Sequence, residues 1–236
     1  MTLKAMLFDL DGTLLDYDMR RDFLPPYFAA LAAHVADVVS PNALTAAVMR
    51  GSDAISNNDG SRTNLEAFAE VFYPLIGHAR EAMEPRFMDF YENVFPSLQK
   101  YARRKPEARR AMQAAFDRGC DVVIATNPHF PAIATQHRLA WAGIDDFNFR
   151  KVTAYENSSF AKPNLGYYRE ILDELGRAPE EALMIGDEAM DMVAGHLGCP
   201  TFLVASAATH LEEIDPPPTY QGALTDLITL LADSKI

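Results

Sequence analysis

The sequence predicts an α/β fold in which a Rossmann-like, doubly wound parallel sheet forms the core and an all-helical cap domain is inserted into it. Over residues 106–236, short apolar runs alternate with helical patterns, which is typical of βαβ units. Residues 17–105 instead contain amphipathic runs and few segments of β type. We therefore expect the core to comprise residues 1–16 and 106–236, and the cap to comprise residues 17–105.

The first strand is predicted at Ala5–Phe8, a short apolar run that is followed by Asp9 and Asp11. Because Asp11-Gly12 favours a tight turn, this run could also be the first arm of a hairpin. The residues after it mix apolar and charged side chains without alternation, which argues against a second arm. The strand is therefore expected to pair with distant apolar runs, at 121–125, 182–185 and 201–205, with a further short strand at 147–153.

Helical patterns separate these runs. In the core, helices are expected over 106–118, 131–142, 164–175 and 190–197, each followed by a glycine, and over 224–232. In the cap, amphipathic runs predict helices over 41–50, 64–76 and 80–91. Ser40 before Pro41 is a favourable helix start, because a serine side chain can accept a hydrogen bond from a free amide of the first turn.

Composition and charge narrow the class of protein. With 236 residues, 49% of them hydrophobic, the chain can bury a full core. Its net charge of −12 argues against binding a phosphate backbone, so we expect no nucleic-acid partner. Cys120 and Cys199 lack metal-type spacing, and no uncharged run is long enough to span a membrane. We expect a cytoplasmic protein without a membrane partner, and the oligomeric state stays open.

Polar side chains follow three of the predicted strands, at the carboxyl end of each. They are Asp9 and Asp11 after the first strand, Thr126 and Asn127 after the second, and Asp187 after the third, with Asp191 one helical turn beyond. The carboxyl ends of parallel strands form the edge at which ligands bind in open sheets, so these residues are expected to converge in one crevice. Lys162, which precedes Pro163 at a helix start, could reach the same place.

Four acids in one crevice need a counter-charge. Asp9 and Asp11 are two positions apart on an extended chain, so both side chains project to the same side. Together with Asp187 and Asp191 they would repel one another unless protons, a lysine or a metal cation compensate the charge. An all-oxygen ligand set suits Mg²⁺, which commonly binds one or two carboxylates, waters and a substrate phosphate. The pattern therefore indicates a small-molecule phosphate ester as the ligand.

Four short stretches carry a resemblance to a known family: Asp9-Leu-Asp11-Gly-Thr13, Thr126-Asn127, Lys162-Pro163 and Gly186-Asp187-Glu-Ala-Met-Asp191. In this order they resemble the four motifs of the haloacid dehalogenase (HAD) superfamily. The helical segment after the first motif resembles the C1 cap of that superfamily. Any one motif arises easily by chance, but four in order, each on the predicted element, are specific.

The resemblance implies catalytic roles. Asp9 would be the nucleophile that forms an aspartyl-phosphate. Asp11 would be the general acid and base, which protonates the leaving alkoxide and then activates water. Thr126 would donate a hydrogen bond to the phosphoryl group. Lys162 would stabilise the charge of the nucleophile and of the phosphoryl group.

The resemblance also implies the binding residues. The phosphate would be bound by Thr126, Asn127 and Lys162. The metal ligands would be Asp9, the backbone carbonyl of Asp11, and Asp187 and Asp191, directly or through water. Three positions depart from common members of the superfamily, namely Tyr17, Leu165 and Glu188, and we assign no role to the last.

Most of these residues also have an ordinary structural explanation when taken singly. Thr126 could cap a helix, Lys162 could be an exposed lysine, and Asp191 could be an acid favoured in the first turn of a helix. His129 is expected to be an exposed loop histidine.

Three functions follow in order of preference. The first is a Mg²⁺-dependent phosphomonoester hydrolase that acts on a small soluble phosphorylated metabolite. The second is a phosphomutase, which would return the phosphoryl group to a sugar instead of water. The third is a non-catalytic binding module on the same scaffold. The acid at Asp11 disfavours carbon–halogen cleavage, because the dehalogenases of the superfamily lack an acid there.

Overall fold

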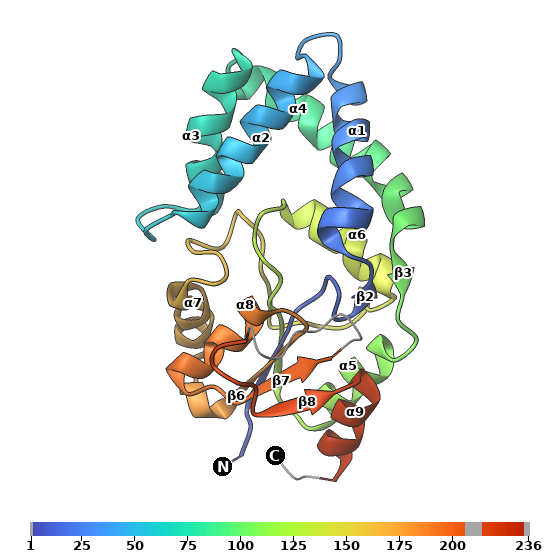
Figure 1. The fold of residues 1–236 in the computed structure, drawn as a ribbon, viewed down its shortest axis with the longest axis vertical. Coiled ribbons are helices and arrows are strands. Elements are labelled where there is room, and N and C mark those ends of the chain that lie inside the picture. Colours follow the sequence, from blue (N-terminus) through green and yellow to red (C-terminus); the bar gives the residue numbers. More distant parts are fainter. Residues whose placement is uncertain (1, 206–213, 234–236) are drawn as a thin grey trace.

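The computed structural model describes residues 2–205 and 214–233. Its core is a six-stranded parallel sheet, shown in Figure 1 below the cap helices. In spatial order the strands are β5 (Lys151–Val152), β4 (Asp121–Ile124), β1 (Ala5–Phe8), β6 (Ala182–Gly186), β7 (Thr201–Val204) and β8 (Tyr220–Gly222). The order runs outward from β1 in both directions along the chain, which confirms the doubly wound α/β fold.

The register of the three central strands sets up the site. Phe8 of β1 lies opposite Ile124 of β4 and Ile185 of β6. The pairing continues for one more residue, because the Asp9 amide donates to the Ile185 carbonyl at 2.8 Å. Side chains that follow these three strands therefore start from the same edge of the sheet.

Helices cover both faces of the sheet. Alternate residues of each strand point to opposite faces. On one face, Met6, Phe8, Ile124 and Ile185 belong to a buried cluster with α5 (Ala108–Asp117), α6 (Ala132–Ala142) and α9 (Leu224–Ala232). On the other face, Ala5, Leu7, Val123 and Met184 pack with α7 (Leu165–Leu175) and the 3₁₀ helix η5 (Val193–Leu197).

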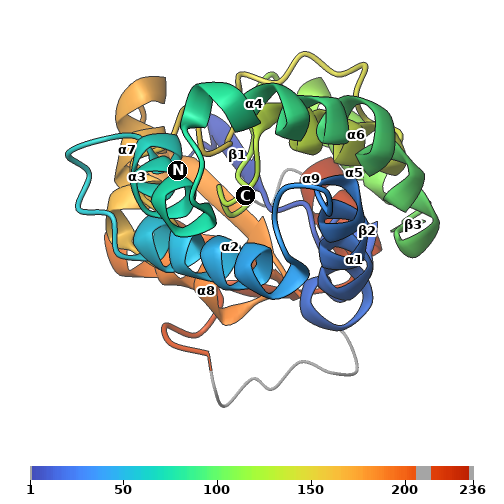
Figure 2. The same ribbon diagram turned by 90° about the horizontal axis from the view of Figure 1, so that it is seen from above.

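The cap consists of helices above the carboxyl edge of the sheet (Figures 1 and 2). They are the π-helical turn η1 (Met19–Phe23), α1 (Leu24–His34), α2 (Pro41–Ser56), α3 (Asn64–Ile76), α4 (Arg80–Asp89), η2 (Phe90–Val94) and η3 (Phe95–Tyr101). Ser40 starts α2 as predicted, and its hydroxyl accepts from the Ala43 amide at 3.4 Å. A two-stranded antiparallel ribbon, β2 (Leu15–Asp16) with β3 (Arg103–Arg104), joins the two connections between cap and core.

The cap packs on the core near α6 and beside the segment 155–160, among other contacts. Near α6, the aromatic ring of Phe95 stacks on Trp141 with centroids 5.3 Å apart, within one apolar cluster that includes both cap and core residues. At the other side, the first amides of α3 donate to the core segment 155–160: Asn64 to the Ser158 carbonyl at 2.8 Å and Leu65 to the Tyr155 carbonyl at 2.7 Å. The division at residues 17 and 105 stays a prediction.

Several elements differ from the expected bounds. The helix expected over 190–197 is α8 (Ala189–Met192) followed by η5, and α2 extends beyond residue 50 to Ser56. The strand expected over 147–153 is only β5, and β2, β3 and β8 were not predicted. Strands of two or three residues are too short for a period-two pattern to show. Among the described residues, no helix is both long and apolar enough to cross a membrane.

Candidate active site

Three of the four predicted carboxylates meet at the carboxyl edge of the sheet. One oxygen each from Asp9, Asp187 and Asp191 lies within 4.8 Å of the other two. Asp9 and Asp191 are buried, and Asp187 is partly exposed. The side chain of Asp11 is not part of this group. We call Asp9, Asp187 and Asp191 the carboxylate group.

The loop after β1 brings its backbone close to Asp187. The amide of Leu15 donates to the Leu10 carbonyl at 2.9 Å and closes the loop around Gly12. Gly12 has φ of +84°, and a Cβ atom at this position would overlap the Asp187 carboxylate. Thr13 donates its hydroxyl to Oδ1 of Asp187 at 2.8 Å. The glycine therefore permits the close approach, and the threonine orients the acid.

Lys162 supplies a positive charge to the carboxylate group. Its Nζ donates to Oδ1 of Asp9 at 2.8 Å and to Oδ1 of Asp191 at 2.6 Å. Its side chain is only 1% exposed, so the alternative of an ordinary exposed lysine is wrong. The lysine lies just before α7, and this loop brings it back to the carboxyl edge of the sheet.

Burial and mutual repulsion dominate the electrostatics of this group. Burial raises the pKa of Asp187 and Asp191 above the usual carboxyl range, and the charge of Asp9 raises both further, although Lys162 opposes the rise at Asp191. Burial opposes a charge on Lys162, but the carboxylates of Asp191 and Asp9 raise its pKa well above normal. One ammonium does not neutralise three ionised carboxylates, so the group must take up protons or bind a cation.

The donor set fits Mg²⁺. Oxygen ligands from one or two carboxylates, completed by waters and a substrate phosphate, are what this ion prefers in proteins. Asp9, Asp187 and Asp191 offer only carboxylate oxygens, and their close spacing leaves excess negative charge at one point.

Thr126 and Asn127, which follow β4, contact Asp11 and the backbone of Lys162. The Thr126 hydroxyl donates to Oδ2 of Asp11 at 3.4 Å. Its carbonyl accepts the Tyr167 hydroxyl at 2.9 Å, which anchors the end of the strand to α7. Oδ1 of Asn127 accepts from the backbone amide of Lys162 at 3.2 Å. Thr126 thus contacts Asp11, and Asn127 orients the chain that carries Lys162.

Asp11 has partners of its own. The Tyr17 hydroxyl donates to its Oδ1, and Nη1 of Arg138 donates to its Oδ2. Burial raises the pKa of Asp11, Arg138 lowers it, and the charge of Asp9 raises it. The sequence departure at Tyr17 therefore coincides with a contact to Asp11.

Sequence reasoning missed Arg138, although the sequence holds a signal for it. On α6, Arg138 is three residues after Thr135 and four before Ala142, and all three are buried. Residues with this spacing share one face of a helix. A charge on a buried face requires a partner, and here the partner is Asp11.

Two further residues lie close to the site. The ring of His129 shares a 2.8 Å hydrogen bond between its Nδ1 and the Ser52 hydroxyl of α2. His129 lies in a loop as expected, but it is only partly exposed, and burial lowers its pKa to about 4. Burial and the charge of Asp9 raise the pKa of Glu188, and Arg20 and Lys162 lower it. Its backbone amide donates to Oδ2 of Asp191 at 3.1 Å.

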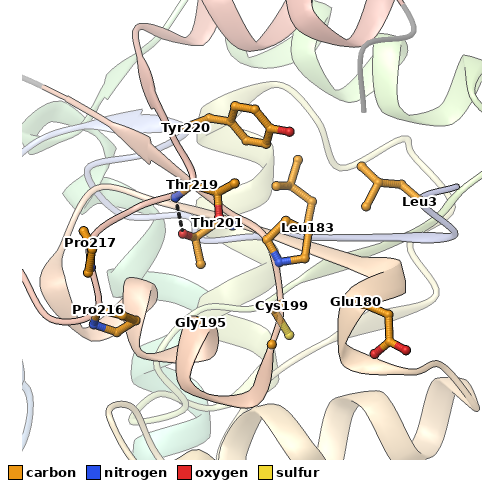
Figure 3. Close-up of a pocket in the computed structure, with 12 residues that line it drawn as sticks. Leu3, Glu180, Leu183, Gly195, Cys199, Thr201, Pro216, Pro217, Thr219 and Tyr220 are labelled. Carbon is orange, nitrogen blue, oxygen red and sulfur yellow. Dashed lines mark hydrogen bonds between the residues drawn. The ribbon is translucent and has the colours of Figure 1, made fainter. Parts of the chain in front are cut away.

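A separate hollow lies elsewhere. It has a volume of about 510 Å³ and opens at the amino ends of the strands, between Leu183, Cys199, Thr201 and Tyr220 (Figure 3). The candidate site residues lie at the opposite, carboxyl ends, so this hollow is not part of the candidate active site.

Comparison with known families and sequences agrees with this geometry. A family model described as haloacid dehalogenase-like hydrolase matches residues 3–197. A phosphoglycolate phosphatase of Vibrio vulnificus (strain YJ016) is 27% identical over 221 residues, which cover 90% of this chain and 88% of the relative. A phosphoglycolate phosphatase of Xanthomonas campestris pv. campestris (strain 8004) is 27% identical over 214 residues, which cover 90% and 87%.

Solved structures share the fold. A HAD phosphatase from Thermococcus onnurineus superimposes with a TM-score of 0.59 at 19% identity, covering 99% of this chain and 100% of that one. The L-2-haloacid dehalogenase from Xanthobacter autotrophicus has a TM-score of 0.56 at 18% identity, covering 98% and 99%. A phosphatase and a dehalogenase therefore share this fold, so the fold does not distinguish phosphate-ester hydrolysis from carbon–halogen cleavage. The residues of the site must distinguish them.

Proposed function

The chain belongs to the haloacid dehalogenase-like hydrolase family, and from this premise we propose that it is a Mg²⁺-dependent phosphomonoester hydrolase that acts through an aspartyl-phosphate. The observation that carries the proposal is the carboxylate of Asp9, which accepts the Lys162 ammonium inside a group of three acids at the carboxyl edge of the sheet. A phosphate ester can bring its own negative charge into this group only when cations compensate it.

Asp9 is the proposed nucleophile. One of its carboxylate oxygens attacks phosphorus, a bond forms between Asp9 and the phosphoryl group, and the bond to the ester oxygen breaks. Lys162 holds Asp9 in place and offers positive charge to the phosphoryl oxygens. Thr126, which contacts Asp11, and Asn127, which contacts the backbone of Lys162, are the proposed phosphate-binding residues.

Asp11 is the proposed general acid and base. It gives a proton to the departing alkoxide and takes one back from the water that attacks the phosphoryl group on Asp9. Inorganic phosphate and an alcohol are then released, and both aspartates return to their starting states.

Asp9, Asp187, Asp191 and the backbone carbonyl of Asp11 are the proposed ligands of Mg²⁺. When bound, the ion neutralises phosphoryl charge. Asp187 is already oriented for this role by the hydroxyl of Thr13, and Asp191 by the backbone amide of Glu188.

Asp11 favours phosphoryl transfer over carbon–halogen cleavage. Halide is a stable anion that leaves without a proton, whereas an alkoxide needs an acid. An acid held at this position by Arg138 and Tyr17 therefore supports an ester substrate. The two relatives named as phosphoglycolate phosphatases make 2-phosphoglycolate the first small phosphorylated metabolite to test.

The test is release of inorganic phosphate from p-nitrophenyl phosphate, 2-phosphoglycolate and a panel of other phosphorylated metabolites, with Mg²⁺ and with a chelator. We expect Mg²⁺-dependent release that falls by at least about 10³-fold in Asp9→Asn. Asp145→Asn is the matched control, because Asp145 is exposed and follows α6 outside the site. It should keep wild-type activity.

Two outcomes would overturn the hydrolase. Conversion of one sugar phosphate into its isomer without phosphate release would indicate a phosphomutase. Absence of turnover across the panel, while Mg²⁺ still raises the unfolding temperature, would indicate a binding module.

A further inference from the structure

A buried arginine outside the four motifs contacts Asp11. The side chain of Arg138 is 1% exposed, and its Nη1 donates to Oδ2 of Asp11. Its Nη2 donates to the Thr135 hydroxyl at 2.9 Å, and its guanidinium carbon lies 4.9 Å from the centre of the Phe130 ring. Among the described residues, its Nε has no hydrogen-bond partner. Because a buried charge is costly unless it is paired, Arg138 needs the carboxylate of Asp11 as its partner.

The second oxygen of Asp11 is held from another direction. The hydroxyl of Tyr17, which is buried, donates to Oδ1. The Thr126 hydroxyl adds a longer hydrogen bond of 3.4 Å to Oδ2. Three donors therefore reach Asp11 from three parts of the chain: the segment after β2, the end of β4, and α6.

These donors restrict the carboxyl group to one orientation. A carboxylate has about four lone-pair sites for hydrogen bonds. With three of them occupied, one direction is left from which Asp11 can give or receive a proton. A carboxyl group with fewer donors could rotate about its side-chain bonds and point its proton away from the ester oxygen.

We propose that Arg138 and Tyr17 are positioning residues that orient Asp11 for proton transfer and thereby adapt the site to alkyl phosphates, whose leaving groups must be protonated. The inference rests on the proposed function, in which Asp11 protonates the ester oxygen as the bond between that oxygen and phosphorus breaks. An aryl ester with a stable leaving anion, such as p-nitrophenolate, departs without that proton.

The test compares kcat/KM for an alkyl phosphate with kcat/KM for p-nitrophenyl phosphate, because this ratio of constants reports the steps up to cleavage of the ester bond. Glycerol 3-phosphate and 2-phosphoglycolate serve as alkyl substrates. In Arg138→Gln, the alkyl value should fall by about 100-fold or more and the aryl value by less than about threefold. Tyr17→Phe, which removes only one hydroxyl, should show the same selective loss at about 10-fold.

Two variants address folding. Arg138→Lys keeps a positive charge without the planar fork and should recover part of the alkyl activity lost in Arg138→Gln. Arg177→Gln removes a partly buried arginine that pairs with Asp121 at 2.7 Å, away from Asp11. It is the matched control for loss of an ion pair, and it should leave the ratio of alkyl to aryl activity unchanged.

The outcomes separate the inference from the proposed function. A wild type without Mg²⁺-dependent phosphate release overturns the proposed function, and the inference falls with it. A wild type that is active, with selective alkyl loss in Asp11→Asn but equal alkyl and aryl changes in the Arg138 and Tyr17 variants, overturns the inference alone. Selective alkyl loss in all three variants supports it.

Discussion

The ammonium nitrogen of Lys162 lies 2.8 Å from a carboxylate oxygen of Asp9, although 153 residues separate the two along the chain. The parallel sheet makes this contact possible, because it turns residues at distant sequence positions into neighbours at one edge.

Replacing Lys162 with methionine should leave the carboxylate group without its buried counter-charge. We expect the free energy of unfolding without Mg²⁺ to fall by about 3–5 kcal/mol, as for other buried pairs that lose one partner. Mg²⁺ should restore part of this loss, since it supplies positive charge to the same acids. Urea unfolding at pH 7, with Mg²⁺ and with a chelator, measures both effects.

Lys4→Met is the control for this change. Lys4 is half-exposed and pairs with Glu181 at the opposite end of the sheet, so its loss should cost no more than about 1 kcal/mol with or without Mg²⁺. Equal stability of the Lys162 and Lys4 variants in the chelator would contradict the prediction.

Gly12→Ala should lower activity strongly, because the added methyl group would collide with the Asp187 carboxylate in addition to straining the backbone. Gly12 has φ of +84°, and its added methyl group would overlap the Asp187 carboxylate. Gly77 is the matched control, because its φ is +75° and a methyl group there would meet nothing within 4 Å. Both variants should lose about 1–2 kcal/mol of stability from the left-handed backbone. Only Gly12→Ala should lose phosphatase activity, by about 100-fold or more. Wild-type kcat in Gly12→Ala would refute the close approach of Gly12 to the Asp187 carboxylate.

His129 should make the protein sensitive to acid. Its pKa is about 4 in the folded chain and near its ordinary value of 6.5 when unfolded, so the unfolded state binds more protons between these values. Stability contributed by the neutral ring is complete above pH 6.5 and is lost as the pH falls toward 4, by no more than about 3 kcal/mol. His129→Gln should flatten this part of the pH dependence of unfolding. Identical slopes for the wild type and His129→Gln would show that the contact between His129 and Ser52 does not sense protons.

Asn64→Asp should weaken the attachment of α3 to the core. The buried Asn64 amide donates from Nδ2 to the Phe160 carbonyl at 3.0 Å, and its Oδ1 accepts from Asn58 at 2.9 Å. An aspartate would set a carboxylate against that carbonyl, at a cost of about 2 kcal/mol or more at pH 7. The exposed Asn148→Asp, in the loop after α6, should change stability by less than about 0.5 kcal/mol. Matching denaturation midpoints for the two variants at pH 7 would refute this role of Asn64.

The central strands could be predicted from sequence because each is an apolar run with polar residues or glycine after it. β1, β4, β6 and β7 lie where these runs predicted them. β2, β3 and β8 could not be predicted, because strands of two or three residues owe their existence to neighbours that are distant in the sequence.

The candidate site likewise contains residues that the sequence predicted and one that it did not. Asp9 and Asp187 follow strands and Asp191 lies one helical turn beyond, so the topology predicted that they would meet. Lys162 was expected only to be able to reach them, and the structure shows that it does. Arg138 is different, because a charged residue within a helical pattern usually faces solvent. Only its spacing relative to Thr135 and Ala142 indicated a buried face, and only the structure shows that Asp11 lies opposite.

The ribbon of β2 and β3 has a consequence for the history of such a chain. Leu15 pairs with Arg104, so the points at which the chain leaves and re-enters the core are direct neighbours. An inserted segment of any length can be exchanged there without a change in strand order, provided that its two ends meet side by side. Selection could therefore remodel the insertion for new substrates, provided that its first residue, Tyr17, keeps its hydrogen bond to Asp11.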